Sequence, residues 1–207
     1  MTEIGRRGLL KMIGTVPVAG LALSPAKALE AQEGARKAVA AAARKGLPYA
    51  PKFFSAHEWA TVRTLADIVI PKDERSGSAT DALVPEYMDF TMTDPLIGER
   101  EREERQTAMR GGLAWLDLEC QDRFSKNFLD GGEAERKQVL DDIAYPDNAQ
   151  DKPALRPGVK FFTSFRDLTA SGFWSSRMGV EDLQYMGNTY VAEWKGPPPE
   201  VLGKLGL

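Results

Sequence analysis

The chain has 207 residues, a formal net charge of −3 and 43% hydrophobic residues, values that fit one globular domain with its own core. Because it is mildly acidic, it offers no basic surface for nucleic acid, which we do not expect as a partner. Cys120 is its only cysteine and His57 its only histidine, which excludes an internal disulfide, a multi-histidine metal site and a C-x-x-C-H haem attachment. The sequence also lacks the G-x-G-x-x-G turn of FAD and NAD sites, so we expect no cofactor in this chain.

Residues 1–28 have the three parts of an export signal. A polar, basic head is followed by an apolar stretch, residues 12–23, and then by a short end of small residues. In that end, Ala26 and Ala28 flank Lys27 and form the A-x-A pattern at which such signals are cleaved. The sequence therefore predicts a signal at 1–28 that is removed after Ala28.

Two adjacent arginines in the head indicate the export route. The complete motif consists of Arg6, Arg7, Leu9, Leu10 and Lys11. It is typical of the twin-arginine (Tat) route, which carries proteins that are already folded, so we expect contact with the Tat translocase and a location in the periplasm. The alternative is a basic N-terminus before a membrane anchor, but residues 12–23 fall short of the roughly 20 apolar residues that span a bilayer.

The rest of the chain is expected to be all-α. Residues 29–52 are rich in alanine and have almost no large apolar side chain, so we expect a helical arm, solvated or docked on a partner. Residues 53–207 should form one domain of five or six helices, because apolar residues recur at spacings of three and four. The helices are expected at residues 56–70, 84–93, 99–130, 133–145 and 159–176, with one or two further turns at 200–205. The remainder of residues 177–207 is expected to be a long, irregular, aromatic tail.

Local motifs support these bounds. Ser55 and Glu58 have the S-x-x-E spacing of a capping box, in which each side chain satisfies a backbone N–H at the start of a helix. Pro71 should end that helix. The pair Gly111-Gly112 either bends the long helix or allows another helix to pack closely against it.

Two residues could carry chemistry, and each also has an ordinary structural interpretation. His57 beside Glu58 could act as a base with an orienting carboxylate, but a residue in the first turn of a helix is expected to face solvent. Cys120 lies on an apolar stripe, which favours a buried, inert thiol over an intermolecular disulfide.

A group of acidic residues is a third candidate. It lacks the alternating acidic pattern of a calcium-binding loop, so we favour a solvated loop over a calcium site. The group consists of Asp73, Glu74, Asp81, Glu86 and Asp89.

Aromatic residues gather in the last third of the chain. Phe161 and Phe162 are adjacent in an expected helix, as are Phe173 and Trp174, so one helix face cannot bury both members of a pair. The surplus must be covered either by the tail or by another chain, and aromatic anchors dominate interfaces between proteins. The candidates for a partner interface are Phe161, Phe162, Phe173, Trp174, Tyr185 and Trp194.

Two ordered sets of motifs carry a resemblance to a known family. The first set is Phe53-Phe54-Ser55-x-x-Glu58, Ile68-Val69-Ile70-Pro71-x-Asp73 and Tyr87-Met88-Asp89. The second set is Phe161-Phe162-x-x-x-Arg166-x-x-Thr169-x-x-Gly172-Phe173-Trp174-Ser175, Gly187-Asn188 and Trp194-x-Gly196-x-Pro198. Together with the Tat signal, these motifs resemble the gluconate 2-dehydrogenase subunit 3 family in the right order over nearly the whole chain.

The resemblance implies an accessory role. Members of this family are small subunits of periplasmic or membrane-associated sugar dehydrogenases. Their large subunit is an FAD-containing flavoprotein of the glucose-methanol-choline (GMC) oxidoreductase type, which commonly lacks an export signal, and a multihaem c-type cytochrome often takes the electrons. The resemblance therefore implies a non-catalytic subunit that supplies the Tat signal and stabilises the flavoprotein.

One segment departs from many family members. Residues 178–188 are similar to a branch found beside dehydrogenases that act on glycosides, including oxidation at sugar C3, which puts gluconate in doubt as the substrate. The residues themselves leave two other functions open. One is a self-sufficient periplasmic enzyme that uses His57 with nearby carboxylates, and the other is a periplasmic protein whose aromatic tail stacks on sugars.

Overall fold

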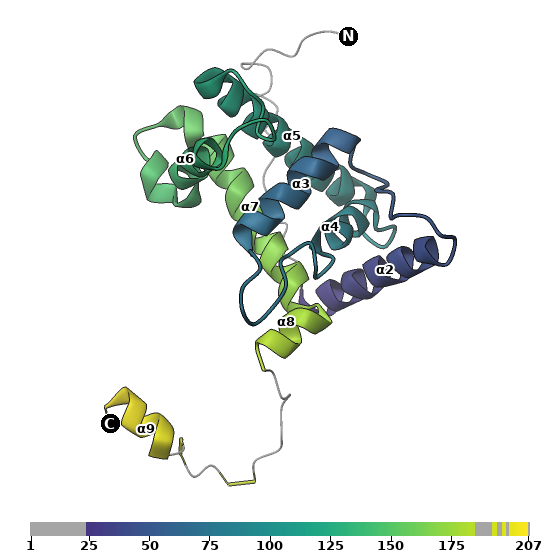
Figure 1. Cartoon of the computed structure of the whole chain (residues 1–207), viewed down its shortest axis with the longest axis vertical. Helices are drawn as coiled ribbons and strands as arrows, with labels where there is room; N and C mark the ends of the chain where they lie inside the picture. The colour runs from purple at the N-terminus through teal and green to yellow at the C-terminus, as the bar shows by residue number, and fades with distance from the viewer. Residues whose placement is uncertain (1–23, 185–191, 194–195, 198, 207) are drawn as a thin grey trace.

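The computed structural model describes residues 24–184, 192–193, 196–197 and 199–206, and this part of the chain is helical without strands (Figure 1). The all-α expectation is confirmed. The α-helices are α2 (Pro25–Ala43), α3 (Ala56–Val69), α4 (Val84–Thr93), α5 (Glu99–Phe124), α6 (Glu133–Ala144), α7 (Arg156–Trp174), α8 (Arg177–Asp182) and α9 (Pro199–Leu205). Two short 3-10 turns, η1 (Pro146–Ala149) and η2 (Pro153–Leu155), lie between α6 and α7.

Several helix ends differ from the expectation for local reasons. The long helix α5 ends at Phe124 because Ser125 takes a left-handed conformation, with φ of 56°. α7 begins at Arg156, with a proline in its first turn, where a missing N–H does no harm. The segment expected to be irregular after residue 176 begins with α8, because the Ser176 side chain accepts a hydrogen bond from Gly179 N and caps a further helix.

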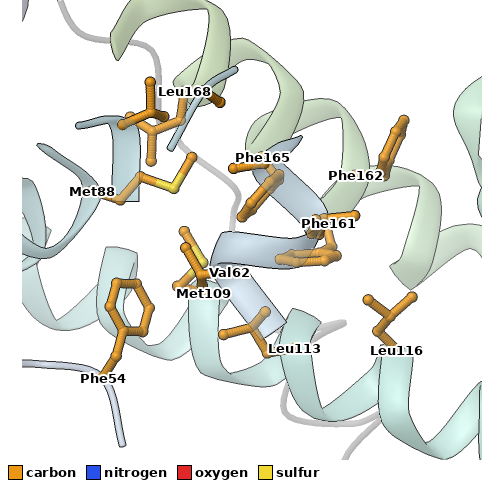
Figure 2. Packing of buried hydrophobic residues seen from close by; sticks show 14 of the residues in the cluster. Phe54, Val62, Met88, Met109, Leu113, Leu116, Phe161, Phe162, Phe165 and Leu168 are labelled. Atoms are coloured by element: carbon orange, nitrogen blue, oxygen red, sulfur yellow. The ribbon is translucent and has the colours of Figure 1, made fainter. Parts of the chain in front are cut away.

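α7 is the central helix of the domain. It contacts α2, α3, α4, α5, α6 and α8, so apolar residues around most of its circumference are covered. Figure 2 shows Phe161 and Phe165 of α7 pointing toward the apolar residues of α5 and Leu168 toward Met88 of α4, while Phe162 points away from them. The core is thus built around this helix rather than on one face of it.

α5 and α7 pack closely because each places a glycine under an aromatic ring of the other. The Phe161 ring of α7 lies over Gly112 of α5, and a methyl group added at this glycine would overlap the ring. In the same way, the Trp115 ring of α5 lies over Gly158 of α7. Gly112 therefore allows close packing, which is one of the two roles that the sequence leaves open.

α2 belongs to the domain. We expected residues 29–52 to form a helical arm outside the domain. The helix is present, but the expectation that it is solvated or docked on a partner is wrong. α2 packs along α4 and buries a face made of small residues and one glutamine. The Phe90 ring lies against Gly34, so the two helices can approach closely without a large apolar side chain on α2. The buried residues of α2 are Ala28, Ala31, Gln32 and Ala35.

Asp89 of α4 fixes the segment that precedes α3. Its side chain is fully buried, and Oδ2 accepts hydrogen bonds from Tyr49 Oη at 2.7 Å and Lys52 N at 2.9 Å. Oδ1 accepts from Phe53 N at 2.8 Å, with Phe54 N further away at 3.4 Å. Burial, and then the hydrogen bond to Asp89, raise the pKa of Tyr49. These bonds replace the water that the carboxylate loses on burial.

The capping box expected from the sequence is present. Glu58 N donates to Ser55 Oγ at 3.3 Å, and Ser55 N donates to Glu58 Oε2 at 2.8 Å. α3 therefore starts directly after the segment that Asp89 holds, and the two features together set the direction in which α3 enters the core.

We expect Asp89→Asn to lower the free energy of unfolding by about 2–5 kcal/mol. Both carboxylate oxygens face N–H or O–H donors, so the amide nitrogen of asparagine would meet a donor in either orientation. Thermal and urea unfolding would measure the loss. Asp151→Asn, at an exposed position, is the matched control and should change stability little; an equally small effect at Asp89 would contradict the role assigned to its carboxylate.

Candidate functional site

The structure buries three of the six aromatic candidates for a partner interface. Phe161, Phe162 and Phe173 are buried, because α7 is surrounded by helices and both members of an adjacent pair find cover. Trp174, at the end of α7, is 43% exposed and is packed edge-on against Phe173, with ring centroids 5.0 Å apart. Among the described candidates, Trp174 is thus the one with a largely exposed side chain. Tyr185 and Trp194 lie outside the described residues.

A groove between the end of α3, the exposed side of α6 and α7 is a stronger candidate surface. It encloses about 630 Å³, and its floor consists of Ile68, Val69, Pro71, Leu140, Ala144 and Phe162. Ile68 is 42% exposed although it begins the apolar run Ile68-Val69-Ile70. Phe162 therefore does contribute to a candidate surface, but as part of a groove floor rather than as an exposed anchor.

Most of the charged residues around this groove, all except Glu133, form contacts within the chain. Lys137 Nζ pairs with Asp141 of the next turn of α6 at 2.9 Å. The Arg136 guanidinium donates to the carbonyl oxygens of Phe128 and Leu129 at 3.0 and 2.8 Å. Asp67 accepts hydrogen bonds from both the backbone N and the hydroxyl of Thr80, each at 2.8 Å. Because the rim is largely neutralised and the floor is apolar, the groove suits an apolar protein segment better than a charged small molecule.

A second apolar surface lies between α2 and α4. The groove there encloses about 680 Å³ and exposes Leu29 and Leu96, the latter to 82%. Its charged lining residues are Glu30, Glu33, Lys37 and Asp94, and Lys37 pairs with Glu33 at 3.5 Å. The sequence interpretation missed both grooves, because Ile68, Leu29 and Leu96 are scattered apolar residues whose exposure depends on which helices cover them. The run Ile68-Val69-Ile70 was the available clue, since one helix face cannot bury three consecutive residues.

His57 forms a short contact with a carboxylate on another helix. Its Nε2 lies 2.6 Å from Asp117 Oδ2, while Asp117 Oδ1 accepts a hydrogen bond from Phe128 N at 3.0 Å. The pair joins α3, α5 and the loop after α5 at the surface, with the His57 side chain about half exposed. Glu58, the carboxylate next to it in sequence, is engaged in the capping box, so the partner of His57 is one that the sequence did not indicate.

Cys120 is buried in the core, as expected. Burial, followed by the nearby Asp117 carboxylate, raises the pKa of its thiol to about 11. A thiol that is both covered and protonated at neutral pH is a poor nucleophile. The intermolecular disulfide that the sequence left open would need this thiol to become exposed.

The acidic group divides into two parts. Glu86 and Asp89 lie in α4 and are buried, so for them the expectation of a solvated loop is wrong. Burial raises the pKa of Glu86. Asp73 is exposed and accepts hydrogen bonds from Arg75 N and Ser76 N within its own turn; these bonds lower its pKa. Across the described residues, no three histidine, cysteine or acidic side chains are grouped so that they could hold a metal ion.

None of the helices in the described part of the chain is both long and apolar enough to cross a membrane. The export motif, Arg6 to Lys11, precedes the described residues. Ala26 and Ala28 of the expected cleavage site lie within α2.

In a comparison with protein families, residues 56–193 match the family described as gluconate 2-dehydrogenase subunit 3. The match begins at the first residue of α3, covers more than half of the chain, and includes α3, α6 and α7 of the first groove. No curated protein and no solved structure gives a match. The chain therefore belongs to the gluconate 2-dehydrogenase subunit 3 family, named for a subunit of a dehydrogenase complex.

Proposed function

We propose that this chain is the non-catalytic small subunit of a periplasmic, FAD-dependent sugar or glycoside dehydrogenase. It supplies the Tat export signal and stabilises a GMC-type flavoprotein large subunit, which carries the FAD, and a c-type cytochrome takes the electrons. Membership of a family of dehydrogenase subunits is the observation that carries this proposal. The twin-arginine signal supports the export part, because the route serves proteins that fold before they cross the membrane.

The groove formed by α3, α6 and α7 is our candidate for the surface that holds the large subunit. All three helices lie within the family match, and the groove has an apolar floor with a rim whose charges are mostly paired within the chain. Its occupant would be an apolar segment of the flavoprotein, with Ile68 as the exposed contact. Trp174, also exposed, is a second contact of the same kind. In protein–protein interfaces, a few side chains that become buried on association supply most of the binding free energy.

The export part predicts a change of location. Arg6→Lys with Arg7→Lys should leave both subunits in the cytoplasm, because lysine keeps the charge but not the arginine geometry that the motif requires. Dehydrogenase activity in periplasmic and cytoplasmic fractions measures the result. The matched control is Arg36→Lys with Arg44→Lys, at two exposed positions of α2 and its end, which should not affect location. Normal periplasmic activity in the twin-lysine variant would contradict Tat export.

The interface part predicts a loss of binding. Ile68→Glu should weaken association with the flavoprotein at least about tenfold, because it places a charge on the apolar floor of the groove. Co-purification of flavin absorbance with the tagged small subunit measures association, and thermal unfolding checks the fold. Leu96→Glu, an equal change at an exposed leucine in the other groove, is the control. If only the Leu96 variant loses its partner, the interface lies on the α2–α4 side instead.

The short His57–Asp117 contact is the observation that favours a second candidate, an enzyme with its own base. His57→Ala separates the two functions. A general base typically contributes 10²–10⁴-fold to a rate, whereas a subunit without a catalytic role should keep the activity of its complex within about twofold. The Asp117 bond to Phe128 N is independent of the histidine and should preserve the loop. Loss of activity in a variant complex that still assembles would support the enzyme.

A further inference from the structure

The cleavage site expected at the end of the signal lies inside a helix of the folded domain. Ser24 is the N-cap residue of α2 and Pro25 its first residue, so Ala26 and Ala28 occupy the first turn. Ala28 N donates to Ser24 O at 2.9 Å, a helical hydrogen bond, and only 5% of this residue is exposed. The bond to be cut, between Ala28 and Leu29, is therefore in helical backbone.

The rest of α2 holds this turn in place. Ala31 and Ala35 continue the buried stripe that begins at Ala28, at spacings of three and four. Gln32 Nε2 donates to Ala82 O at 2.9 Å, which ties the helix to the residues before α4. α2 packs along α4 and also contacts α7, the central helix of the domain. Unwinding the first turn therefore removes contacts with the core.

Helical backbone is a poor protease substrate. Peptides are usually recognised in an extended form, with the backbone N–H and C=O groups free to pair with the binding protein. In α2 the N–H groups from Ala28 onward and the carbonyl groups from Ser24 onward are already paired within the helix, which leaves only the N–H groups of Ala26 and Lys27 without an intrahelical partner. A bond inside a folded element is cut through transient local opening, and the rate then follows the population of the open form. Cleavage would also place an α-ammonium group at the start of α2, where the helix dipole disfavours positive charge.

We propose that the folded domain restrains the removal of its own signal, so that the Ala28–Leu29 bond is cut only when the first turn of α2 unwinds. This inference rests on the proposed export function, because a chain exported in folded form meets the peptidase with α2 already packed. Processing is then coupled to the docking of α2 on α4. A chain that folds before export therefore keeps residues 1–28 until the contact between α2 and α4 opens.

Cleavage of the purified full chain in detergent by bacterial signal peptidase I tests this proposal, with mass spectrometry to locate and time the cut. A Gly-Ser-Gly-Ser insertion between Ala28 and Leu29 separates the site from the helix, and its last serine can cap what remains of α2. We expect this variant to be cut at least about tenfold faster than the unaltered chain. The same insertion between Gly46 and Leu47, in the exposed turn after α2, is the control and should leave the rate unchanged.

A second pair of variants tests the docking itself. Ala35→Glu introduces a charge on the buried face of α2 and should speed cleavage, whereas Ala40→Glu, on the exposed face, should not. Circular dichroism confirms that each variant remains helical. Equal rates for the unaltered chain and the variant with the insertion after Ala28 would overturn the proposal, and so would no cut after Ala28 in that variant. Because the assay needs no translocation, its outcome is separate from that of the twin-lysine export experiment.

Discussion

The domain depends on the close approach of α5 and α7, which two glycines make possible. Gly112 lies under the Phe161 ring and Gly158 under the Trp115 ring, so each helix offers the other a gap where a larger side chain would clash. This contact places α7 in the middle of the domain, where five further helices contact it within the described residues. A helix in that position can bury apolar residues on several sides at once. The burial of Phe161, Phe162 and Phe173 follows from this arrangement.

Asp89 has a comparable role where the segment before α3 enters the core. The segment before α3 has no regular secondary structure, so its backbone N–H groups need acceptors when the chain is buried. The Asp89 carboxylate provides them from α4, and in doing so holds Phe53 and Phe54 in the core. This buried acid is therefore a structural hydrogen-bond acceptor.

Because these aromatic and acidic residues are buried in the core, the candidate surfaces for a partner are the grooves between helices. The α3–α6–α7 groove is apolar at its floor, and most of the charges at its rim are paired within the chain, which suits it to the protein partner that we propose. The groove lies within the family match, whereas α2 and α9 lie outside it. α2 nevertheless packs on the core, so the element that follows the expected signal is physically joined to the element that would hold the partner.

The sequence by itself determined the family, the all-α class, the capping box at Ser55 and the buried state of Cys120, because these depend on residues close together in the chain or on the order of short motifs. It also placed the main helices, since their apolar spacing is a local property. Only the tertiary structure decided which apolar residues are covered. Phe161 and Ile68 look alike in sequence, but α5 covers the first while the second is left at the edge of a groove. The sequence likewise did not reveal that α2 docks on the domain. Its buried face consists mainly of alanine, so its contacts come from the close approach of α4 and not from a large apolar side chain of α2.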